Sequence, residues 1–200
     1  SDRDIWEYPL NLDRAEVRRL ILHVADMENI YSRYYFFGEN CSYGLMFLLE
    51  AARPSLHLTD QFGWWVIPLD TIRAMKASGL FTDAVYRPSK STKINYLSAL
   101  LTPKLRREAW EVARGKREPA EVLAQDIPKE EKIRLLDLTS ENLQYVYTKG
   151  DLNKDLYLPR FLKTLEARST LGDTGEWRYS IPPPGRPDEG HRSKRLAAGF

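Results

Sequence analysis

An aromatic run, a glycine, a polar turn and an apolar segment follow one another between positions 34 and 52. Residues 34–37 have the composition of a β-strand and end at Gly38, whereas residues 45–52 are rich in strong helix formers. This order predicts a strand, a turn and a helix. It places Cys41 at the N-terminus of that helix.

Cys41 is the only cysteine of the chain. Unpaired N–H groups and the positive end of the helix dipole stabilise a thiolate over a thiol, which is how a helix N-terminus activates a nucleophile. The alternative is a small buried hydrophobe, the commoner role of a lone cysteine. The polar neighbours Glu39, Asn40 and Ser42 favour the nucleophile, because an inert core cysteine usually lies inside an apolar run.

Composition excludes several classes of protein. With 42% hydrophobic residues in 200, the chain can form a real core. The 30 basic residues nearly balance the 28 acidic ones, so charge does not indicate a nucleic-acid partner. No apolar run reaches the length of a membrane span and no signal peptide is visible. Three histidines without clustered spacing predict no metal site, and we expect no cofactor.

The first ninety residues mix expected strands and helices. Strands are expected near residues 5–8 and 84–86. A helix begins after Asp13, which has capping-box spacing to Glu16, and Asp70 is expected to cap a later helix that stops at Gly79. The stripe predicted to face the core from the first helix is Val17, Leu20, Ile21, Val24 and Met27.

Beyond Ser89 the patterns indicate helices only, with starts near residues 103, 119, 128 and 154–159. The predicted fold class is therefore α+β, mostly α, with a Cys-bearing part over residues 1–90 and a helical extension over 91–171. Residues 172–200 have the composition of a Pro/Gly linker. Positions 196–198 are either the first strand of a strand-rich domain or part of a basic tail. Both ends look cut, so we expect a fragment of a longer polypeptide.

A second aromatic group, Phe62, Trp64 and Trp65, brackets Gly63. Core packing is the plainer interpretation. The functional one is the wall of an apolar pocket or a contact with lipid, since tryptophan and tyrosine combine an apolar body with one polar group.

Several blocks of the sequence together resemble a known family. They are DIWEYPLNL at 4–12, YYFFGENCSY at 34–43, LLEAARP at 48–54, WVIP at 65–68, DTIR at 70–73 and YRPS at 86–89. In this order they resemble the N-terminal periplasmic domain of the Lnb-type lipoprotein N-acyltransferases of Gram-negative bacteria, over roughly residues 2–90. The Asn-Cys pair is also similar to the permuted NlpC-type and LRAT-type branch of papain-like thiol enzymes.

The resemblance implies a periplasmic enzyme with a partial papain-like core. Cys41 is then the nucleophile, Asn40 a neighbour that orients it, and the acyl group passes through a Cys41 thioester from a phospholipid to the N-terminal amine of a lipoprotein. The resemblance is equally consistent with a related thiol hydrolase. The expected substrate-binding residues are Tyr35, Phe37, Tyr43, Trp64 and Trp65. The membrane surface is an expected partner, and the alternative function is a noncatalytic interaction module of the periplasm or outer membrane.

The same resemblance implies a histidine base on a strand that precedes the cysteine helix, and we expect that strand to lie upstream of this fragment. Of the internal histidines, His23 is expected at the edge of an apolar helix face and His191 in the tail. His57 is the weak internal candidate for the base. We expect the base outside the chain.

Overall fold

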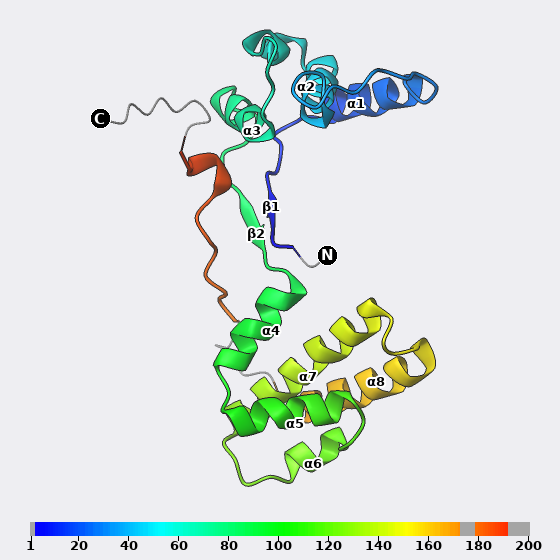
Figure 1. Cartoon of the computed structure of the whole chain (residues 1–200), viewed down its shortest axis with the longest axis vertical. Coiled ribbons are helices and arrows are strands. Elements are labelled where there is room, and N and C mark those ends of the chain that lie inside the picture. Colours follow the sequence, from blue (N-terminus) through cyan, green and yellow to red (C-terminus); the bar gives the residue numbers. More distant parts are fainter. Residues whose placement is uncertain (1–2, 173–178, 192–200) are drawn as a thin grey trace, which may run out of the picture. The chain divides into compact units, whose positions relative to one another are not determined.

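The computed structural model describes residues 3–172 and 179–191 (Figure 1). The chain divides into two compact units. The Cys41 unit is formed by residues 6–86 and the described part of 183–200, and the helical unit by the described part of 1–5 together with 87–182. Helices dominate the described residues, and one two-stranded sheet pairs β1 (Ile5–Glu7) with β2 (Val85–Arg87). The predicted α+β class is confirmed.

The Cys41 unit contains α1 (Arg14–Asp26), α2 (Cys41–Ala52), the 3₁₀ turns η1 (Pro54–Leu56) and η2 (Thr59–Gln61), and α3 (Pro68–Ala77). The predicted capping box between Asp13 and Glu16 is present. Glu16 also receives two hydrogen bonds from Arg53, at 2.6 and 2.7 Å. These bonds, more than the N–H of Asp13, hold the pKa of Glu16 at about 2. They join the start of α1 to the end of α2, so the two helices run antiparallel.

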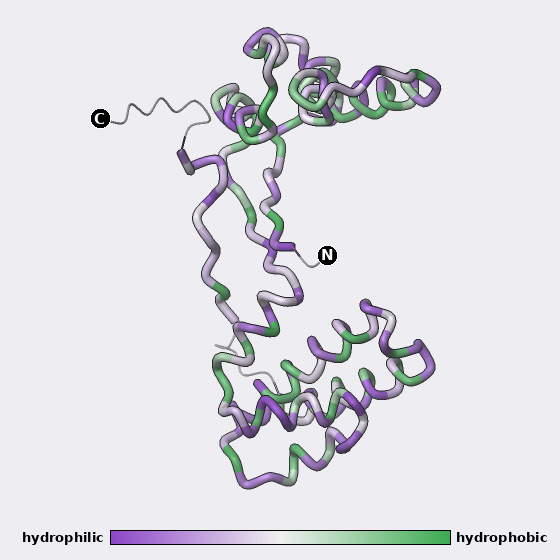
Figure 2. Tube along the Cα trace, in the orientation of Figure 1, coloured by the Kyte–Doolittle hydropathy of each residue, from purple (hydrophilic) through white to green (hydrophobic). Residues whose placement is uncertain are grey.

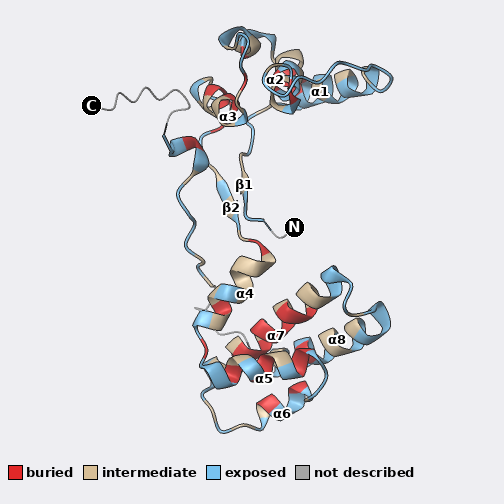
Figure 3. Ribbon diagram, viewed as in Figure 1, coloured by how far each residue is buried: buried red, intermediate tan, exposed pale blue. Residues whose placement is uncertain are grey.

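The apolar stripe of α1 does not face a core as predicted. Val17, Ile21 and Val24 are 40%, 62% and 50% exposed, whereas the buried residue of this helix is the paired Glu16. Figure 2 shows hydrophobic positions along α1, and Figure 3 shows the same helix largely exposed. Leu20 and Met27 of the stripe are half-buried, but Val17, Ile21 and Val24 remain exposed because α2 occupies only one side of α1.

Two further local predictions are wrong. Residues 34–37 form a loop and not a strand, because the backbone of Phe37 accepts one hydrogen bond from Val66 (2.8 Å) and no regular ladder forms. Asp70 is not a cap: α3 begins with Pro68 after the N-cap Ile67. The Asp70 carboxylate instead forms an ion pair with Arg73 at 2.8 Å, one turn along the helix.

The core of the Cys41 unit lies between α2, α3 and the loops that join them. Its buried side chains are Met46, Leu49, Leu58, Val66, Ala74, Met75, Leu80 and Phe81.

A late segment of the chain completes this unit. The turn η3 (Pro187–Glu189) packs on α3, and the side chain of Asp188 is fully buried. Asp188 accepts hydrogen bonds from Tyr8, Lys76 and Arg186 at 2.9–3.1 Å. Burial raises the pKa of the carboxyl group, but the bonds from Arg186, Lys76 and Tyr8 outweigh it and set the pKa at about 2. We call residues 186–191 the docked segment.

The helical unit contains α4 (Lys90–Ala99), α5 (Pro103–Ala113), α6 (Pro119–Leu123), α7 (Lys129–Lys149) and α8 (Lys154–Thr170). The predicted starts near residues 103, 119 and 128 are confirmed, and α8 starts at 154, the first of the two alternatives, with Pro159 inside the helix. The Thr102 and Asn153 side chains cap their helices. Buried residues concentrate on α5 and α7 (Figure 3). Among the buried polar side chains here, Asn142 is fully buried, and its amide nitrogen and oxygen both lack a hydrogen-bond partner among the described residues.

Within the described residues, no helix combines the length and the hydropathy that a membrane span requires. The strand considered for positions 196–198 lies outside the described residues.

Candidate functional site

Cys41 is the first residue of α2, as predicted, and it is exposed to solvent. The preceding residue, Asn40, has an extended backbone and caps the helix. Its side-chain oxygen accepts the N–H groups of Ser42 (3.0 Å) and Tyr43 (3.2 Å). The N–H of Cys41 itself has no acceptor among the described residues. It is therefore the free donor nearest to the sulfur, where the oxyanion of an attacked acyl group would form.

The amide of Asn40 holds the loops around Cys41 in place. Its nitrogen donates to the backbone oxygens of Phe36 (3.2 Å) and Val66 (2.8 Å), and the residue is only 5% exposed. An amide side chain has two donor hydrogens and one acceptor oxygen, and all of them are used here. In this geometry Asn40 acts on Cys41 through the backbone, by fixing the first turn of α2.

Aromatic side chains gather on the two loops that Asn40 joins. Phe37 stacks on Trp65 with ring centroids 4.5 Å apart, and Phe36 meets Phe37 edge-on at 4.8 Å. Phe37 and Trp65 remain 53% and 58% exposed, although each has an aromatic neighbour. The stacked pair thus forms an open apolar platform on the loops that Asn40 fixes to the first turn of α2.

The other expected substrate-binding residues are placed differently. Trp64 is almost completely exposed and Tyr35 is half exposed. Tyr43, on the first turn of α2, packs against the core of the Cys41 unit. Of the expected set, the structure therefore stacks only Phe37 and Trp65 on each other.

The face of α2 that carries Cys41 is apolar and uncovered. Helical spacing places the exposed Gly44 and the half-buried Leu48 on the same side as Cys41, and turns the buried Met46 away from it. Flanking this side, Leu45 is 46% exposed, whereas Phe47 lies farther round the helix against His23 of α1. A helix that is apolar all round usually has partners on every side. This apolar side therefore makes the surroundings of the thiol suited to hydrocarbon.

The comparisons with known proteins agree with the sequence blocks around this site. Residues 1–78 match the family model described as the Lnb N-terminal periplasmic domain. The chain carries an Lnb-type periplasmic domain. Residues 84–178 match a second family model, described only as a domain of unknown function (DUF7842). Among curated proteins and solved structures, no similar one is found.

The match places the chain in the periplasm and connects it with lipoprotein modification in the cell envelope. Cys41 and Asn40, with the platform of Phe37 and Trp65, all lie within the matched residues. The exposed Cys41 at the start of α2 therefore belongs to the matched domain.

Neither His23 nor His57 lies at the start of α2. The ring of His23 contacts the ring of Phe47, with centroids 5.6 Å apart. Phe47 is six positions after Cys41, which is about 9 Å along the axis of α2. His57 follows η1 at the far end of α2, in a left-handed conformation with φ 48°, and lies 3.4 Å from Asp60. Thr59, two positions after His57, donates two hydrogen bonds to the carboxylate of Glu50 on α2. These bonds hold the loop that carries His57 near the C-terminal half of α2. The carbonyl oxygen of His191 accepts a hydrogen bond from Arg73 on α3.

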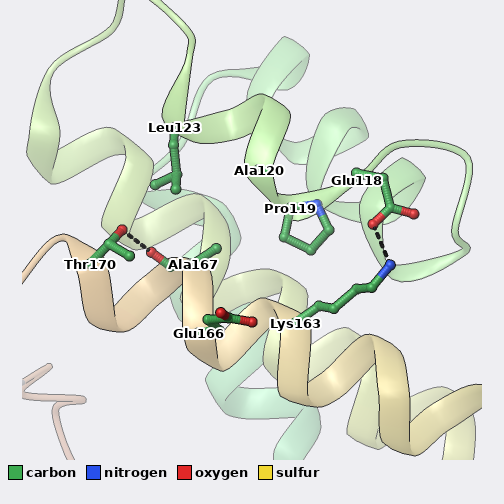
Figure 4. Close-up of a pocket in the computed structure, with 8 residues that line it drawn as sticks. All are labelled: Glu118, Pro119, Ala120, Leu123, Lys163, Glu166, Ala167 and Thr170. Carbon is green, nitrogen blue, oxygen red and sulfur yellow. Dashed lines mark hydrogen bonds and ion pairs between the residues drawn. The ribbon is translucent and has the colours of Figure 1, made fainter.

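A cavity of about 420 Å³ lies in the helical unit, within the residues of the second match (Figure 4). It lies between α6 and α8 and is lined mainly by apolar groups. An ion pair of 3.0 Å between Glu118 and Lys163 crosses one end. Nothing in the sequence indicated this cavity, because its walls come from segments about 45 positions apart. Among the described residues, no cluster of three or more possible metal ligands is present.

Proposed function

We propose that the chain is the Cys41-bearing part of a periplasmic acyltransferase that passes an acyl group through a Cys41 thioester. The donor is a phospholipid and the acceptor is the N-terminal amine of a lipoprotein. One observation carries the proposal: the only cysteine is exposed at the first position of a helix, in a domain whose family is associated with lipoprotein modification.

The chemistry needs two steps that balance. The thiolate sulfur attacks the ester carbonyl carbon, an S–C bond forms, and the C–O bond to glycerol breaks. The released alkoxide takes a proton and leaves as a lysophospholipid. The acceptor amine then attacks the thioester carbon, an N–C bond forms, and the C–S bond breaks to regenerate the thiolate as the nitrogen loses a proton.

Each local feature of the site has a role in these steps. The free N–H of Cys41 is a donor for the oxyanion, and the uncovered apolar side of α2 offers hydrocarbon contacts to the acyl chain. Phe37 and Trp65 extend the apolar surface on the loops next to α2. Proton transfer belongs to a histidine outside residues 1–200, since His23 and His57 lie along and beyond α2.

The test is capture of the acyl-enzyme in the intact protein. Purified protein is mixed with phospholipid vesicles and digested, and mass spectrometry looks for a Cys41 peptide with the mass of one added acyl group. Neutral hydroxylamine, which cleaves thioesters, should remove that mass. Cys41→Ser should abolish lipoprotein acylation, and His57→Ala should retain it.

The noncatalytic interaction module is the other outcome of this test. Full lipoprotein acylation by Cys41→Ser would exclude Cys41 as the nucleophile. Retained envelope function without any acylated Cys41 would favour the module instead. Loss of activity in His57→Ala, with its fold intact by circular dichroism, would show that the general base lies within residues 1–200.

A further inference from the structure

The cavity between α6 and α8 is the start of a longer groove. A second cavity of about 160 Å³ adjoins it, and the two share Glu118, Pro119 and Lys163. Glu118 and Lys163, which line both cavities, form an ion pair at the edge of the larger one (Figure 4). Both side chains of this pair are about 60% exposed, and exposed ion pairs contribute at most about 1 kcal/mol. A ligand can therefore displace it at little cost.

The two ends of the groove differ in chemistry. The larger cavity is apolar over most of its lining, from Pro119, Ala120 and Leu123 on α6 and Ala167 on α8. The aliphatic part of Thr170 continues this wall toward the end of α8. Its volume is within the range of small-molecule sites, which is about 300–1,000 Å³.

The smaller cavity is polar and mostly cationic. Arg117, Arg160 and Lys163 line it, against the single carboxylate of Glu118. Arg117 forms ion pairs with Glu108 (3.4 Å) and Glu121 (3.3 Å). Arg160, in contrast, has no carboxylate partner among the described residues.

The position of Arg160 is set by a glycine. Gly115 follows α5 with φ +71°, and a Cβ at this position would lie 2.5 Å from the guanidinium carbon of Arg160. The guanidinium group therefore lies directly against the Gly115 backbone, and it lines the smaller cavity. The absence of a side chain at Gly115 leaves room for this cation.

We propose that this groove binds a single-chain amphiphile with an anionic head. The hydrocarbon chain occupies the apolar cavity between α6 and α8, and the carboxylate or phosphate head pairs with Arg160 and Lys163. The opposite charges of the head and of the groove's polar end determine the orientation. This site is separate from Cys41 and does not depend on the proposed acyl transfer.

Isothermal titration calorimetry on the full chain tests the proposal with soluble monomeric probes. Dodecanoate and dodecyl phosphate have the two anionic heads, and dodecyl maltoside has the same chain with an uncharged head. We expect at least one anion to bind at least tenfold more tightly than the maltoside, and the preferred anion identifies the head. Binding should tighten about fourfold for each added CH₂ between eight and twelve carbons.

Variants locate the site. Arg160→Gln and Lys163→Gln should each weaken anion binding about tenfold or more, because each removes a charge-assisted hydrogen bond. Ala120→Trp should fill the apolar end and abolish binding. Arg107→Gln, an exposed arginine of α5 outside both cavities, is the matched control and should leave binding unchanged. Circular dichroism establishes that each variant is folded.

Equal binding of the maltoside and both anions would overturn the charge argument. Equal effects of Arg160→Gln and Arg107→Gln would overturn the location. Cys41→Ser should bind the amphiphile normally, so failure of acyl transfer and failure of this site are separate results.

Discussion

Removing the charge of Asp188 should destabilise the Cys41 unit by about 2 kcal/mol. The carboxyl pKa falls from 3.8 to about 2 in the folded chain, and each pKa unit corresponds to about 1.4 kcal/mol. The full side-chain burial of Asp188 keeps solvent from screening its bonds to Lys76 and Arg186. Asp188→Asn retains the shape of the side chain and removes the charge.

The pH dependence gives the same quantity independently. Because folding lowers the pKa of Asp188, its contribution is complete above about pH 5 and is lost as the pH falls through about 2. Asp188→Asn should lack this part of the acid destabilisation. Tyr8 provides a second readout, since burial and then its bond to Asp188 raise its pKa from 10.0 to about 12, and the variant should lower that value.

The assay is urea denaturation, with hydrogen exchange of α3 to assign the transition to the Cys41 unit. Glu189→Gln is the matched control, because Glu189 lies in the same turn with a side chain 55% exposed and should change stability by less than about 0.5 kcal/mol. The reasoning is refuted if the two variants have equal free energies of unfolding.

Three further predictions concern single positions. Asn142→Leu should stabilise the helical unit by about 1–3 kcal/mol in urea denaturation, because it removes a buried amide without partners; a loss of stability would contradict this. Gly115→Ala should destabilise that unit by about 1 kcal/mol or more, through its positive φ and the clash with Arg160, whereas Lys116→Ala next to it should be nearly neutral. Asn40→Asp keeps the helix cap, but it loses the hydrogen bond to Val66 and adds a negative charge beside Cys41. Alkylation of the exposed thiol by iodoacetamide should therefore slow. An unchanged alkylation rate would show that these contacts do not affect the thiol.

Local signals in the sequence were enough to place most helices. Asp13 with Glu16 and Thr102 before a proline each give a start that the structure confirms, because capping depends on residues within one turn. The order of aromatic run, glycine, polar turn and apolar segment likewise placed Cys41 correctly at the start of α2, where the structure shows Asn40 as the cap.

Long-range contacts explain what could not be predicted. The bond from Asn40 to Val66 spans 26 positions, and it fixes residues 34–37 in a loop where composition favours a strand. The stripe of α1 has the right period for a core face, but the period does not say which side has a partner. The groove between α6 and α8 likewise depends on two helices that meet only in the fold.

The docked segment has a consequence for how the chain can be divided. Tyr8 and Asp188, 180 positions apart, belong to the same unit, and Asp4 binds Ser89 and Thr92 of the helical unit. Each unit therefore includes a short segment that is separated from the rest of that unit by the whole of the other unit in the sequence. A cut between the two matched families, near residue 80, separates both pairs of partners. During synthesis, too, the Cys41 unit is complete only after the whole helical unit has been made.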